Sequence, residues 1–169
     1  ITVGEYAFFG HNVSVLTGPE LRTIFLNLDS MRDELLYSNV KGKNPFKDAR
    51  VRKAFYQAID MEAIHAKVMR GMSVNSALLI SPLLYARAGE FKRWPYDTAA
   101  AKKLLAEAGY PDGKGMPPVD INCTPQFKDE ITYYANQFNR VLGMPVNVKV
   151  VERATHIRAM NAGEVAFFP

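Results

Sequence analysis

Cysteine is almost absent from this chain, since Cys123 is the only one among its 169 residues. A single cysteine forms neither an intrachain disulfide nor a cysteine-based zinc site, so a packed core must hold the fold together. The chain also lacks any apolar run approaching the roughly 20 residues of a membrane-spanning helix. Hydrophobic residues make up 48% and charged residues 22%, which is typical of globular proteins. The composition therefore predicts one globular domain.

Motifs for catalysis or metal binding are missing as well. The sequence contains no HExxH, CxxC, GxSxG or GxxxxGK pattern. Cys123 alternates with aliphatic residues in a predicted strand, which favours a small core residue over a nucleophile. The histidines share no ligand spacing and fall on different predicted segments: His11, His65 and His156. We therefore expect no enzyme active site, no metal and no cofactor.

The positive charge of the chain is scattered rather than clustered. The net charge is +4, but lysine and arginine alternate with acidic residues along the sequence. The densest basic clusters are short, at residues 50–53 and 92–93. Nucleic-acid-binding domains usually concentrate their basic residues on one face. We therefore expect no nucleic-acid partner.

Residues 48–71 have the pattern of two consecutive helices. Asp48 precedes an apolar stripe that recurs every three or four residues, so it is expected to cap the first helix. Asp60 is expected to cap a second helix that runs to Arg70 and ends at Gly71. Arg50 and Arg52 point about 200° apart on the first helix, so they cannot grip one carboxylate together and are expected to have structural roles.

Strands and further helices are predicted along the rest of the chain. Strands are expected at residues 13–16, 22–28, 119–123 and 146–150, and helices after Asp97, at 128–142 and at 155–162, with Gly109 and Gly143 as terminators. A long polar loop, 29–47, and an irregular apolar segment, 72–94, separate them. This order predicts an α/β fold with a central sheet flanked by helices.

Two blocks of the sequence resemble a known family. Residues 44–60, NPFKDARVRKAFYQAID, and residues 96–113, YDTAAAKKLLAEAGYPDG, resemble conserved blocks of the family 5 extracellular solute-binding proteins. These proteins are the peptide- and nickel-type receptors of ABC importers. The resemblance implies a type II periplasmic-binding-protein-like fold, in which two lobes enclose the ligand.

The resemblance also implies how the chain is organised. Residues 1–169 are expected to form a single α/β lobe of a larger protein, the second lobe of the family. Within it, residues 1–20 are expected to be an inter-lobe or edge-strand region and 21–163 the family-like lobe. Residues 164–169 would begin the return to the missing first lobe, which is then a partner within the same chain.

The function implied by the resemblance is that of the substrate-binding component of an ABC transporter. Such a protein captures peptides or similar small solutes and delivers them to a membrane permease. The implied location is the periplasm, or the cell exterior as a membrane-anchored protein in a Gram-positive cell. Three alternatives stay open: a non-peptide ligand such as an oligosaccharide, an opine or a chelated metal; a small standalone α/β enzyme using Cys123 or a histidine; and a pure interaction module.

Three loops near the ends of predicted strands are candidates for ligand binding, because open α/β sheets bind ligands there. The first follows Asn27, which matches an asparagine of the family. The second supplies the aromatic side chains Tyr85, Trp94 and Tyr96, and the third supplies Gln126 and Lys128. This third loop lacks the arginine by which some dipeptide-binding relatives hold a carboxylate. Lys128 or Gln126 would have to replace it, although Lys128 also fits a solvated position in the first helical turn.

Overall fold

The computed structural model describes residues 23–36, 40–163 and 167–168. The chain divides into two compact units. Unit 1 comprises Ile1–Phe25 and Glu62–Arg93, and unit 2 comprises Leu26–Met61 and Trp94–Pro169. The strand expected at residues 13–16 lies outside the described residues. The organisation of the whole chain as one lobe stays a prediction.

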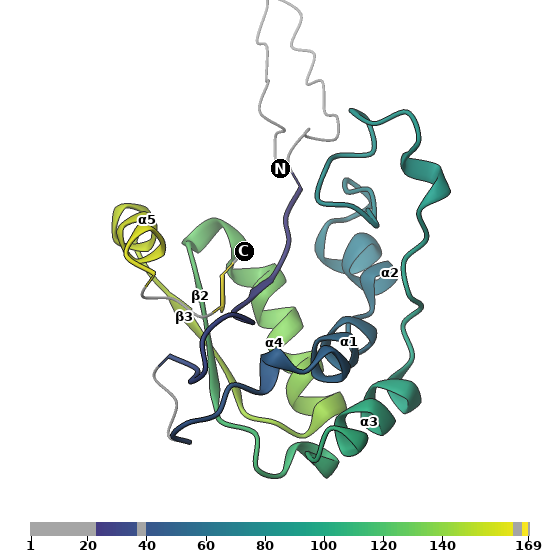
Figure 1. The fold of residues 1–169 in the computed structure, drawn as a ribbon. Helices are drawn as coiled ribbons and strands as arrows, with labels where there is room; N and C mark the ends of the chain where they lie inside the picture. The colour runs from purple at the N-terminus through teal and green to yellow at the C-terminus, as the bar shows by residue number, and fades with distance from the viewer. Residues whose placement is uncertain (1–22, 37–39, 164–166, 169) are drawn as a thin grey trace, which may run out of the picture. The chain divides into compact units, whose positions relative to one another are not determined.

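A β-α-β motif forms the centre of unit 2. Strands β2 (Val119–Cys123) and β3 (Val146–Val150) pair in parallel, in register from Val119 opposite Val146 to Cys123 opposite Val150. Helix α4 (Lys128–Leu142) connects them and packs against both strands (Figure 1). All three elements have the bounds that the sequence predicted. Their strong periodicity, and the left-handed Gly143 that ends α4, explain why.

A second, shorter sheet lies beside this motif. Strands β1 (Asn27–Leu28) and β4 (Phe167–Phe168) pair antiparallel, and β4 lies next to β2. Of the strand expected at 22–28, residue 22 lies outside the described residues, residues 23–26 are not a strand, and the last two residues are. A strand forms only where a neighbouring segment of the chain pairs with it through main-chain hydrogen bonds. Among the described residues, β4 pairs with Asn27 and Leu28 alone. β-branched and aromatic composition does not supply that partner.

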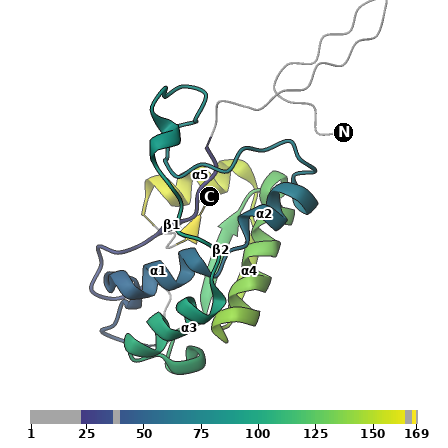
Figure 2. The same ribbon diagram turned by 90° about the vertical axis from the view of Figure 1, so that its right-hand side faces the viewer.

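Helices α1 (Ala49–Gln57) and α3 (Thr98–Glu107) pack against each other, and α3 also packs on α4 (Figure 2). Both begin at predicted caps, since Asp48 accepts a hydrogen bond from the Arg50 amide at 2.8 Å and Asp97 from the Ala100 amide at 2.9 Å. Gly109, after α3, has a φ of 94°, as expected of a terminator. The capping residues therefore fix the starts of both helices locally.

Three phenylalanines join these elements into one core. The Phe55 ring lies 5.0 Å from Phe46 and 4.6 Å from Phe138, measured between centroids. Phe46 belongs to the short 3-10 helix η1 (Pro45–Lys47), and Phe138 to α4. All three side chains are buried. The first family-like block thus supplies two of the three aromatic rings at the centre of unit 2.

The remaining short elements of unit 2 are turns and one helix. The 3-10 turns η4 (Pro111–Gly113) and η5 (Pro125–Phe127) precede β2 and α4. Helix α5 (Arg153–Asn161) follows β3 and begins two residues before the expected Thr155. Glu152 explains the earlier start, because its carboxylate accepts a hydrogen bond from the Ala154 amide at 2.9 Å.

The second predicted helix differs from expectation. It begins as α2 (Met61–Ala63), at the boundary of the units, and continues in unit 1 as the π-helical turn η2 (Ile64–Val68). The Met69 amide donates to the Ile64 carbonyl at 2.9 Å, one residue further back than in an α-helix. Gly71 has a φ of 78°, which confirms the predicted terminator. The expected regular α-helix over 60–70 is therefore wrong in its winding.

The irregular segment that follows contains one short helical turn, η3 (Ala88–Glu90). Its irregular character was predicted from the sequence. Among the described residues, no helix combines the length and the apolar composition needed to cross a membrane.

Candidate functional site

The carboxyl end of the parallel pair β2–β3 carries the third candidate loop. The Val151 amide donates to the Cys123 carbonyl at 2.9 Å, so the two chains stay paired to the point where the loop begins. Thr124 follows at once and is buried, and no described atom forms a hydrogen bond with its hydroxyl oxygen. Gln126 and Lys128 are exposed. The loop thus presents two polar side chains where open α/β sheets bind ligands.

The start of α4 adds main-chain donors to this edge. Phe127 occupies the N-cap position, and its side chain makes no capping hydrogen bond to the helix. The first amides of a helix carry partial positive charge and need acceptors. Asp129 and Glu130, in the first turn, already complement that charge. The edge therefore carries the exposed ammonium of Lys128 and the exposed carboxylate of Asp129 beside its neutral hydrogen-bonding groups.

An aromatic platform in unit 2 surrounds Trp94. The Trp94 ring meets Tyr56 edge to face, with centroids 5.4 Å apart, and Lys53 Nζ lies 4.8 Å from the Trp94 centroid. Trp94 remains 53% exposed, and Tyr96 is exposed nearby in sequence. We call Lys53, Tyr56 and Trp94 the Trp94 platform. An exposed aromatic face beside a cation suits a ligand with a flat or apolar group.

Trp94 was predicted from the sequence to bind ligand, whereas its two partners in the platform were not. Lys53 and Tyr56 lie three residues apart on α1, so they share one helix face. That spacing was visible in the sequence. What the sequence did not show is that Trp94, thirty-eight residues beyond Tyr56, returns to the same face.

The other candidates lie in separate places. Tyr85 belongs to unit 1, where its ring is 6.3 Å from that of Phe91. Asn27 is exposed in β1, opposite Phe168. Within the described part of unit 2, no hydrogen bond, ion pair or ring contact joins two members of the predicted set. Its members in unit 2 are Asn27, Trp94, Tyr96, Gln126 and Lys128. A binding role for the six residues stays a prediction.

His11 lies outside the described residues, and the environments of Cys123 and His156 do not favour a catalytic role. Cys123 is fully buried, and burial raises the pKa of its thiol more than the charge of Lys128 lowers it. A nucleophilic cysteine needs the opposite shift. Burial also lowers the pKa of His156, and His65 Nδ1 lies 3.2 Å from Ser73 Oγ in unit 1. In the described ranges, no group of three His, Cys, Asp or Glu side chains is placed to hold a metal ion.

Arg50 and Arg52 have the structural roles expected of them. Arg50 Nη2 pairs with Asp48 Oδ2 at 2.6 Å, and its Nη1 donates to the Glu107 carbonyl at 2.8 Å, at the end of α3. The hydrogen bonds from Arg50 lower the pKa of the Asp48 carboxyl. Arg52 donates instead to the Phe46 carbonyl at 2.6 Å. The two guanidinium groups thus fix different segments, and neither is free to bind a ligand with the other.

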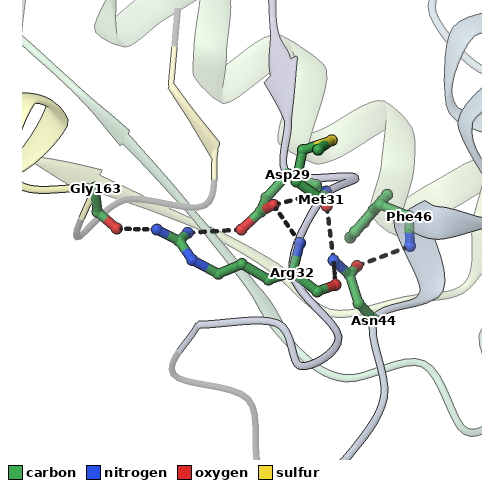
Figure 3. A network of polar contacts seen from close by, with 6 residues as sticks. All are labelled: Asp29, Met31, Arg32, Asn44, Phe46 and Gly163. Atoms are coloured by element: carbon green, nitrogen blue, oxygen red, sulfur yellow. Dashed lines mark hydrogen bonds and ion pairs between the residues drawn. The ribbon is translucent and has the colours of Figure 1, made fainter.

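Asn44, from the first family-like block, fixes the long loop 29–47 (Figure 3). Its amide nitrogen donates to the carbonyls of Asp29 and Arg32, both at 2.9 Å, and its oxygen accepts from the Phe46 amide at 3.0 Å. Leu35 is also buried. The loop therefore does not lie wholly on the surface, because it contacts the core through the buried residues Leu35 and Asn44.

The sequence profile of the bacterial extracellular solute-binding proteins, family 5 (middle region), matches residues 6–168. The chain belongs to this family. Heme-binding protein A of Haemophilus influenzae is 39% identical over 71 residues, which are 42% of this chain and 13% of that protein. The glutathione-binding protein GsiB of Salmonella choleraesuis is 37% identical over 84 residues, 50% of this chain and 16% of the relative.

A comparison with a solved structure shows the fold. The oligopeptide-binding protein AppA of Bacillus subtilis, in complex with a nonapeptide, superimposes with a TM-score of 0.69 at 21% identity. The alignment covers 85% of this chain and 29% of AppA. This confirms the expected type II periplasmic-binding-protein fold. The chain spans less than a third of the length of each of these relatives.

Proposed function

We propose that this chain is part of the substrate-binding receptor of an ABC importer, which captures a peptide or similar small solute and delivers it to a membrane permease. The observation that carries the proposal is the family match over residues 6–168. The periplasm, or the outer face of a Gram-positive membrane, is the location that fits this role. The buried, high-pKa thiol of Cys123 speaks against the alternative of a standalone enzyme.

The mechanism that follows is capture between two lobes. Closure around a ligand buries it, and the ligand's preference for the closed form shifts the population toward the shape that docks on the permease. This chain would contribute one wall of the cleft. A peptide offers amide groups and side chains of every kind, which suits neutral hydrogen-bonding groups and exposed aromatic rings better than a cluster of charges.

Two places in unit 2 are the proposed ligand contacts. The Trp94 platform would receive an apolar or aromatic part of the solute, and the loop at residues 124–128 would bind polar groups through Gln126 and Lys128. Asn27 stays in the proposed set on its match to the family alone, and Tyr85 and Tyr96 stay on the predicted position of their loop alone.

A second candidate function is the same receptor with a non-peptide ligand. The third loop contains no arginine to hold a peptide carboxylate, and lysine cannot reproduce its bidentate grip. Family membership does not decide the ligand, because the relatives named above include proteins described as binding heme and glutathione.

The experiment uses Trp94 as a reporter, because it is the single tryptophan of the chain. The receptor that carries this sequence is purified from its source and titrated with glutathione and with a mixed-sequence nonapeptide, while tryptophan emission and the heat of binding are followed. In a longer receptor, tryptophans outside this sequence are first replaced by phenylalanine. We expect a saturable change of emission with one of the two probes. Absence of saturable heat and emission changes with both probes overturns the peptide proposal, and saturable binding of heme would then support the second candidate.

Lys53→Met tests the platform itself. It removes the cation beside the Trp94 ring and should weaken binding severalfold. Lys102→Met is the matched control, because Lys102 is an exposed lysine on α3 that is not among the proposed contacts. Equal affinity in both variants would contradict a role for the platform.

A further inference from the structure

Strand β1 lies at the start of unit 2, which begins at Leu26. Among the residues that the structure describes, β1 pairs with β4 at two positions, Asn27 with Phe168 and Leu28 with Phe167. A two-stranded ladder is marginal in water even at greater length. A further bond between the segments that carry β1 and β4 would link them more firmly than this ladder and the packing of β4 beside β2 alone.

A single guanidinium supplies that link. Arg32 Nη1 pairs with Asp29 Oδ2 at 2.7 Å, and Arg32 Nη2 donates to the Gly163 carbonyl at 2.6 Å (Figure 3). Asp29 and Arg32 lie in the turn just after β1, whereas Gly163 ends α5, shortly before β4. The Arg32–Gly163 hydrogen bond therefore joins two positions that are 131 residues apart in the sequence, one just after β1 and the other shortly before β4.

The turn around Arg32 is built to aim the guanidinium. The Asp29 carboxylate also accepts hydrogen bonds from the amides of Met31 at 3.1 Å and Arg32 at 3.3 Å, and its side chain is only 10% exposed. Asn44 holds the carbonyls of the same turn from the other side. A carboxylate that binds one edge of a guanidinium orients the whole planar group, so the remaining nitrogen is directed at its second acceptor.

Gly163 lets the Arg32 guanidinium approach its carbonyl closely. A Cβ at this position would lie 2.9 Å from Arg32 Nη2, so a side chain would press on the guanidinium. The φ of Gly163 is 67°, a left-handed conformation that glycine adopts without strain. Its amide donates to the Met160 carbonyl at 3.0 Å, which ties the acceptor carbonyl to the last turn of α5. The acceptor is thus as firmly placed as the donor.

We propose that Arg32 is a positioning residue that holds the segments carrying β1 and β4 together as a clamp, so that these two strands move as one unit when the receptor closes. This inference rests on the proposed function for its purpose, but not for its geometry. Because Arg32 acts through the strands, its loss changes the opening and closing of the cleft and leaves the ligand contacts in place. A charge-assisted hydrogen bond between the turn after β1 and Gly163 after α5 is strong enough to couple the two segments.

The test compares Arg32→Lys and Arg32→Met with the wild-type 169-residue chain by hydrogen–deuterium exchange. Lysine keeps a positive charge for Asp29 but lacks the fork that reaches both acceptors, so it separates the turn from the clamp. We expect exchange at residues 27–28 and 167–168 to rise about tenfold in both variants, as for loss of a hydrogen bond to a charged group. In Arg32→Lys, the main-chain amides of residues 31 and 32 should stay protected from exchange, because both donate to the Asp29 carboxylate. Exchange in β2 and β3 should be unchanged.

Two results would overturn the clamp. One is wild-type exchange at β1 and β4 in Arg32→Lys, and the other is an equal rise in β2 and β3, which would make Arg32 a general stabilising residue. Lys41→Met is the control, since it removes another ion pair of the same loop, Lys41 with Glu34 at 2.9 Å, that does not reach β4. Failure of peptide binding in the receptor would leave this exchange pattern intact, so the clamp and the proposed function fail separately.

Discussion

Gly113 and Gly143 meet backbone to backbone, at the point where turn η4 packs against the end of α4. A Cβ on Gly143 would lie 2.5 Å from the Asp112 carbonyl oxygen, and a Cβ on Gly113 would lie 2.7 Å from the Gly143 carbonyl carbon. Both glycines also have positive φ. Neither main chain has room to yield without moving the turn or the helix.

Gly143→Ala should therefore lower the free energy of unfolding by about 3 kcal/mol, of which roughly 1–2 kcal/mol is the left-handed backbone of a non-glycine residue. Urea denaturation measures the loss. Gly42→Ala is the matched control, because Gly42 has the same φ of 68° but no heavy atom within 4 Å of the added Cβ. Equal losses in the two variants would show that the close approach contributes nothing beyond backbone strain.

The starts of α1 and α3 and the ends of α3 and α4 depend on local signals, and this is why these bounds were predicted well. Asp48 and Asp97 cap α1 and α3, and Gly109 and Gly143 end α3 and α4 with positive φ. Each signal acts within a few residues of sequence. The short extent of strand β1 was not predicted, because it depends on β4. The π-helical winding of η2 was not predicted either, because its hydrogen bonds reach one residue further than the helical periodicity assumes.

Asp97→Ala tests one of these signals at the level of the element. Removal of the cap leaves the Ala100 amide without its acceptor, and the free energy of unfolding should fall by about 1 kcal/mol. Asp97→Asn keeps a side-chain oxygen in the same place and should retain nearly all of the stability. Chemical denaturation of the two variants decides between capping and charge, because a loss confined to the alanine variant shows that the oxygen matters and a similar loss in both shows that the charge matters.

For the whole molecule, ligand binding should depend on chain beyond this sequence. The relatives are matched over 13% to 29% of their length, so this chain would contribute one wall of the proposed cleft. With about half of the contacts and no closure to bury the ligand, the 169-residue chain should bind glutathione and nonapeptides more weakly than micromolar. Titration calorimetry measures this directly, and micromolar or tighter binding by the chain alone would contradict the two-lobe mechanism.

The sequence by itself determined the family, the α/β class, the helix caps and terminators, and both strands of the parallel pair. All of these are written in residue type and spacing, which act over short distances along the chain. The tertiary structure decided which distant segments meet: Trp94 with Tyr56, Arg32 with Gly163, and β1 with β4. Contacts across 38 and 131 residues depend on how all the intervening elements pack, and local periodicity carries no record of that packing.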